Sequence, residues 1–320
     1  MPKVLLLSKD ESRLRELIAE ADLPGLELTV DMDDAEVVVG EMDRLQAGLT
    51  RLPQLQWAQS FSAGVDGLVE LRTDYVLTNV KGVFGQQMAE YVLGYIISHI
   101  RHFQQYRDLQ KTRTWEPIPY RSLTGRRLCV VGTGDIGQYV SRVARTLGMV
   151  VVGVNTTGRN PDESVFSECH AVSDLSDVLP TCEMAVSILP STLRTRQLFT
   201  ESTFEMCRNL VFINAGRGSC VDEEGLLRAL DTGHLEHCYL DVFECEPLPD
   251  MSRFWEHPKV TISPHIAAVG FAEEVFEVGP PMVAGFIPFP GLQRKLSAFR
   301  EGPATEVRRR IRQGVLTSCL

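Results

Sequence analysis

Two side chains suited to acid–base and anion chemistry follow directly on predicted strands. Arg217 stands between two glycines just after the apolar stretch 210–214, and His265 follows the stretch 260–262 and Pro264. An arginine fork pairs with both oxygens of a carboxylate, and an imidazole with an ordinary pKa of about 6.5 exchanges a proton near neutral pH. A surface arginine and a structural histidine are the ordinary alternatives. The positions at strand ends favour a carboxylate anchor and a proton donor.

Metal chemistry is not predicted. The pairs His99 and His102, and His234 and His237, have helix-like spacing, but no further ligand residues accompany them. The eight cysteines form no C-x-x-C pair and no zinc-like cluster with histidine. This usage favours reduced thiols in an intracellular compartment.

A glycine-rich turn between a strand and a helix predicts a dinucleotide site. The apolar stretch 126–131 leads into Gly132, Gly134 and Gly137, and a helical pattern follows at 138–147. In such a G-x-G-x-x-G turn the first glycine permits a tight bend and the second lets a pyrophosphate approach the backbone. The third lets helix and strand pack closely. The phosphate would lie at the helix N-terminus, on free N–H groups.

The end of the next strand distinguishes between the two common nicotinamide dinucleotides. An NAD site usually carries Asp or Glu there, to bond the ribose 2′-hydroxyl. Here the stretch 150–154 is followed by Asn155, Thr156, Thr157 and Arg159, without a carboxylate. Amide, hydroxyl and guanidinium groups suit a 2′-phosphate, which an Asp would repel. We therefore expect NADP(H) to be preferred, with NAD as the second choice; the alternative is a solvated loop with weak selectivity.

The elements that position these residues alternate between strands and helices. Before the glycine turn, strands are predicted at 4–7, 26–30, 37–39, 55–59 and 76–79, with a helix at 11–21 that ends at Pro24. After it, six further strands are predicted at 150–154, 171–172, 184–189, 210–214, 237–241 and 260–262, with a helix at 223–231. A long helical pattern from 86 to about 110 connects the two halves. The alternation predicts an α/β protein with a doubly wound parallel sheet for the dinucleotide and a second parallel sheet before it.

Composition excludes several classes of function. The 320 residues carry a net charge of −10, which argues against binding to nucleic acid or to an anionic membrane. No apolar stretch is long enough to span a bilayer, and the N-terminus lacks a signal-type sequence. We expect a soluble, cytoplasmic protein of two domains.

Taken together, the motifs resemble the D-isomer-specific 2-hydroxyacid dehydrogenase family from Val4 to about Val278. In family order they are Ser62-Ala63-Gly64-Val65-Asp66, Ala89-Glu90-Tyr91, the glycine turn, Asn214-Ala215-Gly216-Arg217-Gly218, Asp241-Val242-Phe243-Glu244-Cys245-Glu246-Pro247 and Ser263-Pro264-His265. The glyoxylate/hydroxypyruvate reductase-like branch is favoured by Phe84-Gly85 and Trp57-Ala58-Gln59-Ser60.

The resemblance implies an NAD(P)-dependent enzyme that reduces a small 2-keto acid, such as glyoxylate or hydroxypyruvate, to the D-2-hydroxy acid. Arg217 would bind the substrate carboxylate and His265 would donate the proton. Glu246 resembles the family's partner carboxylate, which orients the imidazole and raises its pKa. The resemblance also implies a Rossmann domain and a flavodoxin-like substrate domain with substrate between them, and a homodimer formed through the nucleotide domain.

The remaining site residues are expected in two groups. Ala63, Gly64 and Val65 would present backbone N–H groups to the substrate carboxylate, with an ordinary turn as the alternative. Trp115 either walls the substrate pocket or packs the hinge. Cofactor contacts are expected from Gly132, Thr133, Gly134, Asp135, Ile136, Asn155, Thr156, Thr157, Arg159, Leu189, Pro190, Ala215, Gly216, Arg217, Asp241, His265, Ala267 and Ala268.

The C-terminal part departs from the family pattern. We expect a substrate domain at 1–85, a nucleotide-binding domain with its connector at 86–266, and a return segment at 267–320. The return helix starts at 271, but Gly279-Pro280-Pro281 ends it. The sequence beyond has no counterpart in the family; 306–316 is either a basic helix or part of a poorly ordered tail. A catalytically impaired variant, or a nucleotide-sensing scaffold like the dehydrogenase-related corepressors, is therefore the alternative to an active reductase.

Overall fold

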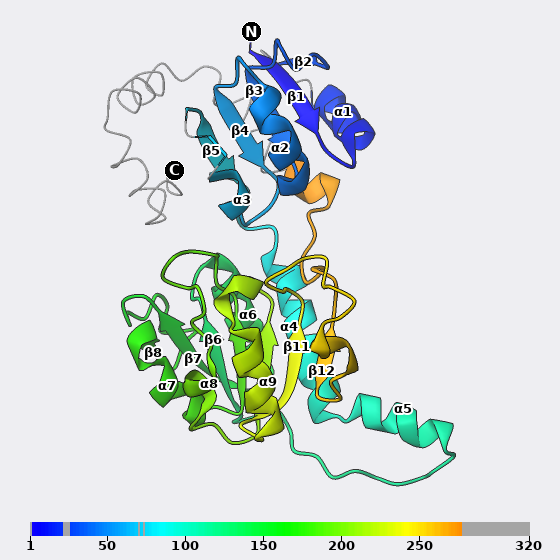
Figure 1. Cartoon of the computed structure of the whole chain (residues 1–320), viewed down its shortest axis with the longest axis vertical. Helices are drawn as coiled ribbons and strands as arrows, with labels where there is room; N and C mark the ends of the chain where they lie inside the picture. Colours follow the sequence, from blue (N-terminus) through cyan, green and yellow to red (C-terminus); the bar gives the residue numbers. More distant parts are fainter. Residues whose placement is uncertain (1, 22–25, 70, 73, 277–320) are drawn as a thin grey trace. The chain divides into compact units, whose positions relative to one another are not determined.

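The computed structural model describes residues 2–21, 26–69, 71–72 and 74–276, which fall into two compact units (Figure 1). The first unit contains the described residues up to Val83 and those from Val269 onward; the second runs from Phe84 to Ala268. A parallel sheet forms the centre of each unit. The predicted helix end at Pro24 and the features predicted for 279–320 lie outside the described residues.

The sheet of the first unit has five parallel strands in the order β2-β1-β3-β4-β5. The strands are β1 (Lys3–Leu7), β2 (Glu27–Thr29), β3 (Val37–Gly40), β4 (Trp57–Ser60) and β5 (Val76–Asn79). Its helices are α1 (Glu11–Glu20), α2 (Met42–Gly48) and α3 (Asp66–Val69). All four residues of β3 and of β4 are buried, as expected for parallel strands covered on both faces. The strand order is that of the flavodoxin-like fold, so the predicted fold is confirmed.

The sheet of the second unit has seven parallel strands in the order β12-β11-β10-β9-β6-β7-β8. They are β6 (Arg127–Val131), β7 (Val150–Asn155), β8 (Glu168–Ala171), β9 (Met184–Ser187), β10 (Leu210–Asn214), β11 (Leu235–Leu240) and β12 (Val260–Ile262). The direction of strand order reverses between β6 and β9, which is the arrangement of a Rossmann sheet. The predicted doubly wound sheet is confirmed. Ligands of such sheets bind beyond the carboxyl ends of the strands, at this reversal.

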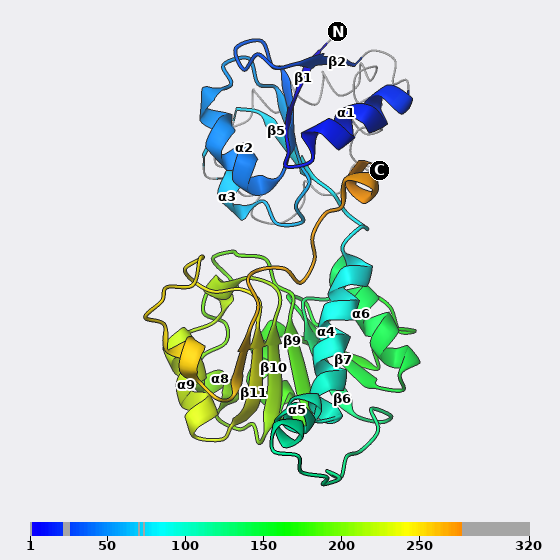
Figure 2. The same ribbon diagram turned by 90° about the vertical axis from the view of Figure 1, so that its right-hand side faces the viewer.

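Helices cover both faces of the second sheet (Figure 2). One face carries α4 (Gly85–Ile100) and α6 (Asp135–Thr146), and the other carries α7 (Leu175–Val178), α8 (Glu201–Phe204) and α9 (Glu223–Asp231). Short 3-10 turns complete the described chain: η1 (Leu49–Arg51), η2 (Val172–Asp174), η3 (Leu179–Thr181), η4 (Gly218–Cys220) and η5 (Arg253–Glu256). The two covering layers explain why the strands read as continuous apolar runs.

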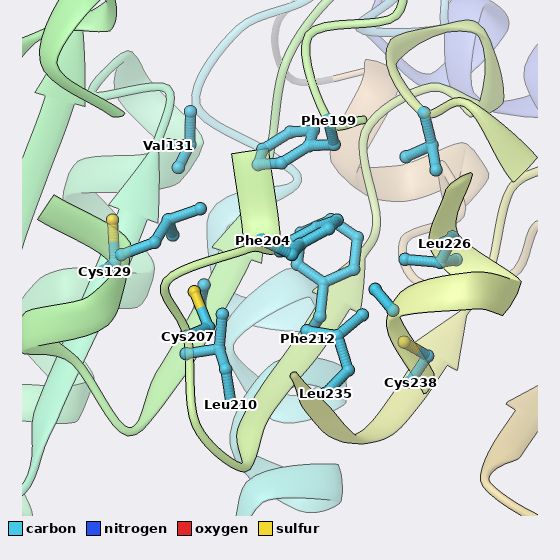
Figure 3. Close-up of a cluster of buried hydrophobic side chains, with 14 of the residues drawn as sticks. Cys129, Val131, Phe199, Phe204, Cys207, Leu210, Phe212, Leu226, Leu235 and Cys238 are labelled. Atoms are coloured by element: carbon cyan, nitrogen blue, oxygen red, sulfur yellow. The ribbon is translucent and has the colours of Figure 1, made fainter. Parts of the chain in front are cut away.

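Three phenylalanines form the centre of the core under α8 and α9 (Figure 3). The ring of Phe212 lies 4.8 Å from that of Phe199 and 5.3 Å from that of Phe204, and all three side chains are fully buried. Cys129 and Cys238 lie in the same cluster and pack as small apolar side chains. This core holds β10 and β11 in place, and those strands end in the loops that carry Arg217 and Glu246.

Two predictions about elements are wrong in detail. The helical pattern from 86 to about 110 is two helices, because His102 has a left-handed backbone (φ 57°) between α4 and α5 (Phe103–Lys111). The third strand of the second sheet lies at Glu168–Ala171 rather than at 171–172, since Val172 already belongs to η2. Short strands with mixed polarity give weak periodic signals, so shifts of this size arise readily.

The chain returns to the first unit after Val269, as the return helix predicts. Residues 272–276 are helical, and Val275 is 2% exposed. Arg13 of α1 donates to Glu273 at 2.9 Å. In the described part of the chain, no helix has the length and apolar character needed to cross a membrane.

Candidate active site

A histidine and a glutamate form a hydrogen-bonded pair in the second unit. His265 follows β12, Glu246 follows β11, and Nδ1 of the imidazole lies 2.7 Å from Oε2 of the carboxylate. The other carboxylate oxygen accepts the backbone N–H of Phe243 at 2.9 Å, which fixes the glutamate from a second side. With Nδ1 bonded to Glu246, Nε2 is the nitrogen that can face a substrate. The pairing implied by the resemblance is thus present in the geometry.

The pair shifts the pKa of both partners. The hydrogen bond and charge of Glu246 raise the pKa of His265 above its usual 6.5, against the opposing effects of burial and of nearby Arg217. Burial alone would raise the pKa of Glu246, but the hydrogen bonds from His265 and Phe243 outweigh it and hold that pKa below 4.5. Near neutral pH the imidazole therefore keeps its proton more than an ordinary histidine does.

Arg217 lies close enough to this pair for its charge to act on the pKa of both partners. It follows β10, and Asn214 at the end of that strand donates from Nδ2 to the Arg217 carbonyl at 3.2 Å. A Cβ on the next residue, Gly218, would stand 1.9 Å from the Phe243 carbonyl carbon. Only glycine permits this contact between the loops of Arg217 and Glu246. The structure therefore brings the three predicted catalytic residues to one edge of one sheet.

The glycine turn has the shape that a dinucleotide pyrophosphate requires. A Cβ on Gly132 would lie 2.6 Å from the Ile188 carbonyl oxygen, and one on Gly137 only 1.9 Å from the Gly132 carbonyl oxygen. A Cβ on Gly134 would meet nothing within 4 Å. Gly132 and Gly137 thus pack the turn against the sheet, whereas Gly134, which is the N-cap of α6, opens outward. The first N–H groups of this helix have no partner within the helix, so the residues fit the phosphate groups of the cofactor.

The loop after β7 is organised by Asn155. Its Nδ2 donates to the Arg159 carbonyl at 2.8 Å and to Thr133 Oγ1 at 2.9 Å. Its Oδ1 accepts the backbone N–H groups of Thr157 at 3.0 Å and of Gly158 at 2.8 Å. The amide predicted to contact the cofactor therefore shapes the loop. The Thr157 hydroxyl also donates to Asn155 Oδ1, at 3.3 Å. The side chains of Thr156, Thr157 and Arg159 are exposed on this loop, where a phosphate could reach them.

The other predicted cofactor residues lie on neighbouring loops of the same edge. A Cβ on Gly216 would stand 2.6 Å from the Leu189 backbone nitrogen, so the loops after β10 and β9 are in backbone contact. Pro190 and Ala215 flank this contact along the chain. Asp135 and Ile136 open α6, and Ala267 and Ala268 follow His265 closely along the chain.

Asp241 has a role that the sequence did not reveal. It is 1% exposed, and its Oδ1 accepts Ser263 Oγ at 2.6 Å and the Ile266 N–H at 2.9 Å, while Oδ2 accepts the Ala267 N–H at 2.8 Å. The same residue accepts the His265 N–H on its backbone oxygen at 2.8 Å. These partners are 22 to 26 residues away, so no local spacing signals the contact. Asp241 holds the loop that carries His265.

The predicted substrate loop belongs to the first unit, where it follows β4. Asn79 donates from Nδ2 to the Ala63 carbonyl at 2.6 Å, and Val65 accepts the Leu68 N–H at 3.0 Å as α3 begins. Among the described residues, none accepts a hydrogen bond from the N–H groups of Gly64 and Val65. The loop thus has the donors that the prediction requires.

Trp115 does not pack a hinge, because it is 99% exposed. It follows α5 and lines a hollow of about 530 Å³ together with Tyr106 and Leu109 of that helix. No side chain of α5 is buried. In the described chain, no three His, Cys, Asp or Glu side chains come together as metal ligands would.

A Rossmann sheet, a glycine turn shaped for a pyrophosphate, and an arginine beside a hydrogen-bonded histidine–glutamate pair define an NAD(P)-dependent oxidoreductase. Sequence comparison identifies the family. The model for "D-isomer specific 2-hydroxyacid dehydrogenase, NAD binding domain" matches residues 93–267, and the chain belongs to this family.

Individual relatives agree with this assignment. The chain is 31% identical over 227 residues to a glyoxylate/hydroxypyruvate reductase A from Serratia proteamaculans, covering 68% of this chain and 72% of that protein. A D-isomer specific 2-hydroxyacid dehydrogenase family protein from Aeromonas salmonicida superposes with a TM-score of 0.83 at 38% identity, covering 89% of this chain and 96% of the other. An NADPH-dependent glyoxylate/hydroxypyruvate reductase from Sinorhizobium meliloti, solved with NADP and sulfate, gives 0.78 at 28% identity, covering 89% and 95%.

Proposed function

We propose that the chain reduces a small 2-keto acid of the glyoxylate or hydroxypyruvate type to the D-2-hydroxy acid, with NADPH as the hydride source. The observation that carries this proposal is the His265–Glu246 pair beside Arg217, on the sheet edge that bears the glycine turn. The reductase names of the similar proteins from Serratia and Sinorhizobium support the substrate type.

The residues divide the chemistry between them. Arg217 anchors the substrate carboxylate through its planar fork and polarises the neighbouring carbonyl. His265, whose pKa is raised by the hydrogen bond to Glu246, gives the proton from Nε2 to the carbonyl oxygen. Glu246 keeps the imidazole oriented and stabilises its charge before the transfer. The reduced nicotinamide supplies the hydride when the cofactor is bound.

Preference for NADPH follows from the loop after β7. Its exposed Thr156, Thr157 and Arg159 offer two hydroxyls and one positive charge, and no carboxylate is present to repel a 2′-phosphate. The similar Sinorhizobium protein is described as NADPH-dependent, which supports this choice. Arg159→Ala should raise KM for NADPH about tenfold and leave KM for NADH unchanged. Equal changes for both cofactors would contradict the proposed phosphate contact.

Turnover of purified protein with NADPH and a panel of 2-keto acids, followed by the loss of nicotinamide absorbance, tests the function. His265→Gln should lower kcat by about 10² to 10⁴, a far larger change than that in the dissociation constant of NADPH. His170→Gln is the matched control, because this histidine also pairs with a glutamate, Glu168, and both residues belong to β8. Undiminished turnover by His265→Gln would overturn the assignment. NADPH binding without turnover of any 2-keto acid would favour a nucleotide-sensing protein.

We also propose that a second copy of the chain covers α5 and the segment that follows it. This surface exposes Phe103 by 51%, Tyr106 by 39% and Trp115 by 99%, a set of aromatic side chains typical of protein interfaces. It belongs to the nucleotide-binding unit, through which the resemblance implies dimerisation. Trp115→Glu should convert a dimer to a monomer in light scattering, whereas exposed Leu193→Glu, on a different loop, should leave the mass unchanged.

A further inference from the structure

A chain of hydrogen bonds runs from α4 to the loop that carries His265. The Tyr91 hydroxyl lies 2.6 Å from Ser263 Oγ, and Ser263 Oγ lies 2.6 Å from Asp241 Oδ1. Ser263 and Asp241 are both buried, at 6% and 1% exposure. Tyr91 belongs to the motif Ala89-Glu90-Tyr91, one of those that carry the resemblance to the family.

Asp241 fixes the direction of these bonds. Its two other partners, the backbone N–H groups of Ile266 and Ala267, can only donate, so both carboxylate oxygens act as acceptors. The Ser263 hydroxyl therefore donates to Asp241, and its remaining capacity is to accept from Tyr91. Burial raises the pKa of Tyr91 far above its ordinary value, so the phenol keeps the proton that it donates.

The loop at the end of this chain needs such support. His265 has a left-handed backbone, with φ 53°, which non-glycine residues adopt at a cost in free energy. Its own N–H and those of the next two residues all bond to Asp241. A conformation of this kind persists only where the surrounding contacts over-determine it. The orientation of the imidazole towards Glu246 therefore depends on how firmly Asp241 is held.

We propose that Tyr91 and Ser263 are positioning residues for the reduction: they fix Asp241, and through it they hold His265 in hydrogen-bond contact with Glu246. This inference rests on the proposed role of His265 as the proton donor. These contacts give Tyr91 a role in the site. It lies on α4, which covers one face of the sheet, and is 172 residues away from Ser263 in sequence.

The Tyr91→Phe variant removes the hydroxyl and keeps the ring, which packs edge-to-face on Tyr95 at 4.8 Å. Without the donor, the Ser263 hydroxyl is free to turn from Asp241 toward other acceptors. The loop then relaxes, the contact between His265 and Glu246 lengthens, and the pKa of His265 falls toward its usual value. A purely structural role for the hydroxyl would leave that pKa unchanged.

Four variants test the proposal: Tyr91→Phe, Ser263→Ala, Ser263→Thr and the control Tyr239→Phe. Tyr239→Phe is the control because it also deletes a tyrosine hydroxyl: that hydroxyl contacts His99 at 3.2 Å, and among the described residues no hydrogen bond joins it to the loop at 263–267. Two readouts are taken: the pH profile of kcat with NADPH and a 2-keto acid, and the NMR titration of the His265 imidazole in protein without cofactor.

Tyr91→Phe should lower kcat about tenfold, and Ser263→Ala about 30-fold, because misplacement of a reacting group by about 1 Å costs up to about 10²-fold. Both should move the imidazole titration and the alkaline limb of the profile to lower pH. Ser263→Thr, which keeps the hydroxyl, should restore both readouts. Tyr239→Phe should lower the melting temperature without moving either.

The proposal is overturned if Tyr91→Phe changes only the melting temperature, as Tyr239→Phe does. A failure of this positioning proposal can be distinguished from a failure of the proposed function. If His265→Gln retains turnover, the function is wrong, yet the imidazole titration still reports whether Tyr91 positions His265.

Discussion

Two loops at the carboxyl edge of the seven-stranded sheet are each built around one polar side chain. The loop at 155–159 is held by the Asn155 amide, which both donates and accepts. The loop at 263–267 is held by the Asp241 carboxylate, which only accepts. Apart from Thr133, the partners of Asn155 are within four residues, whereas those of Asp241 are at least 22 residues away.

The difference matches what each loop presents. A neutral amide shapes a loop without adding charge, so Arg159 remains available to attract a phosphate. A buried carboxylate satisfies three donors at once and can hold His265 in its unfavourable left-handed conformation. The loop at 155–159 is suited to selecting the cofactor, and the loop at 263–267 is suited to orienting the imidazole of His265. Four substitutions test whether the two loops have these separate roles.

Asp241→Asn should have the largest effect. The new amide NH₂ faces a backbone N–H or the Ser263 hydroxyl, so at least one donor loses its acceptor and the His265 loop shifts. We expect kcat to fall by about 10²-fold, and the melting temperature to fall as well because a buried donor is left unsatisfied. Single-turnover kinetics provides the measurement, and Asp231→Asn on α9 is the control. An unchanged kcat would show that the loop does not depend on the carboxylate.

Glu246→Gln should shift the pH dependence. Under the proposed mechanism reduction needs protonated His265, so the rate should be constant at low pH and decline as the pH rises through the raised pKa. Without the carboxylate that pKa falls, so the decline starts at lower pH, and at a fixed pH on the alkaline limb we expect the rate to fall about tenfold. The free energy of unfolding should also decrease as the pH rises. The protonated imidazole stabilises the fold below about pH 6.5, and this contribution is lost as the pH rises through the raised pKa. A limb that does not move would contradict the pairing.

Asn155→Ala tests the first loop. Removing the amide frees the backbone at 157–159, so binding must then order it, and KM should rise about fivefold for NADPH and NADH alike. The alkaline limb of the pH profile should not move, in contrast to Glu246→Gln. Movement of that limb would show that the two loops do not act separately.

Gly158→Ala should have the smallest effect. Gly158 has φ 71°, and a Cβ there would lie 3.0 Å from the Ala171 nitrogen. We expect a loss of about 1 kcal/mol in the free energy of unfolding, measured by denaturant titration, and unchanged kcat at saturating cofactor. Gly94→Ala is the control, since that glycine lies within α4 with nothing within 4 Å of a Cβ, and alanine should stabilise it. Equal effects at the two positions would argue against strain at Gly158.

The same comparison explains what the sequence could predict. Asn155 and its turn are local, and an Asn followed by small polar residues indicates such a turn. Arg217 and His265 were found because each follows an apolar strand. The contacts of Asp241 depend on β11 pairing with β12, where Leu240 lies beside Ile262, and no spacing in the sequence reveals this register. Glu246 was placed by resemblance alone.

Helices and strands could likewise be predicted only where the signal in the sequence is local. Alternating apolar runs were sufficient to predict both parallel sheets, because burial on two faces leaves a strong local pattern. The break at His102 was missed, since no glycine or proline marks it.

The exposed helix α5 has a consequence for how the chain reaches its final state. Nine residues are too few for a stable isolated helix in water, and this helix buries no side chain to compensate. Under the proposed pairing of two copies, the contacts that stabilise α5 come from the second chain. Its helical conformation is then acquired on association, as coupled folding and binding, and becomes a property of the assembly that depends on protein concentration.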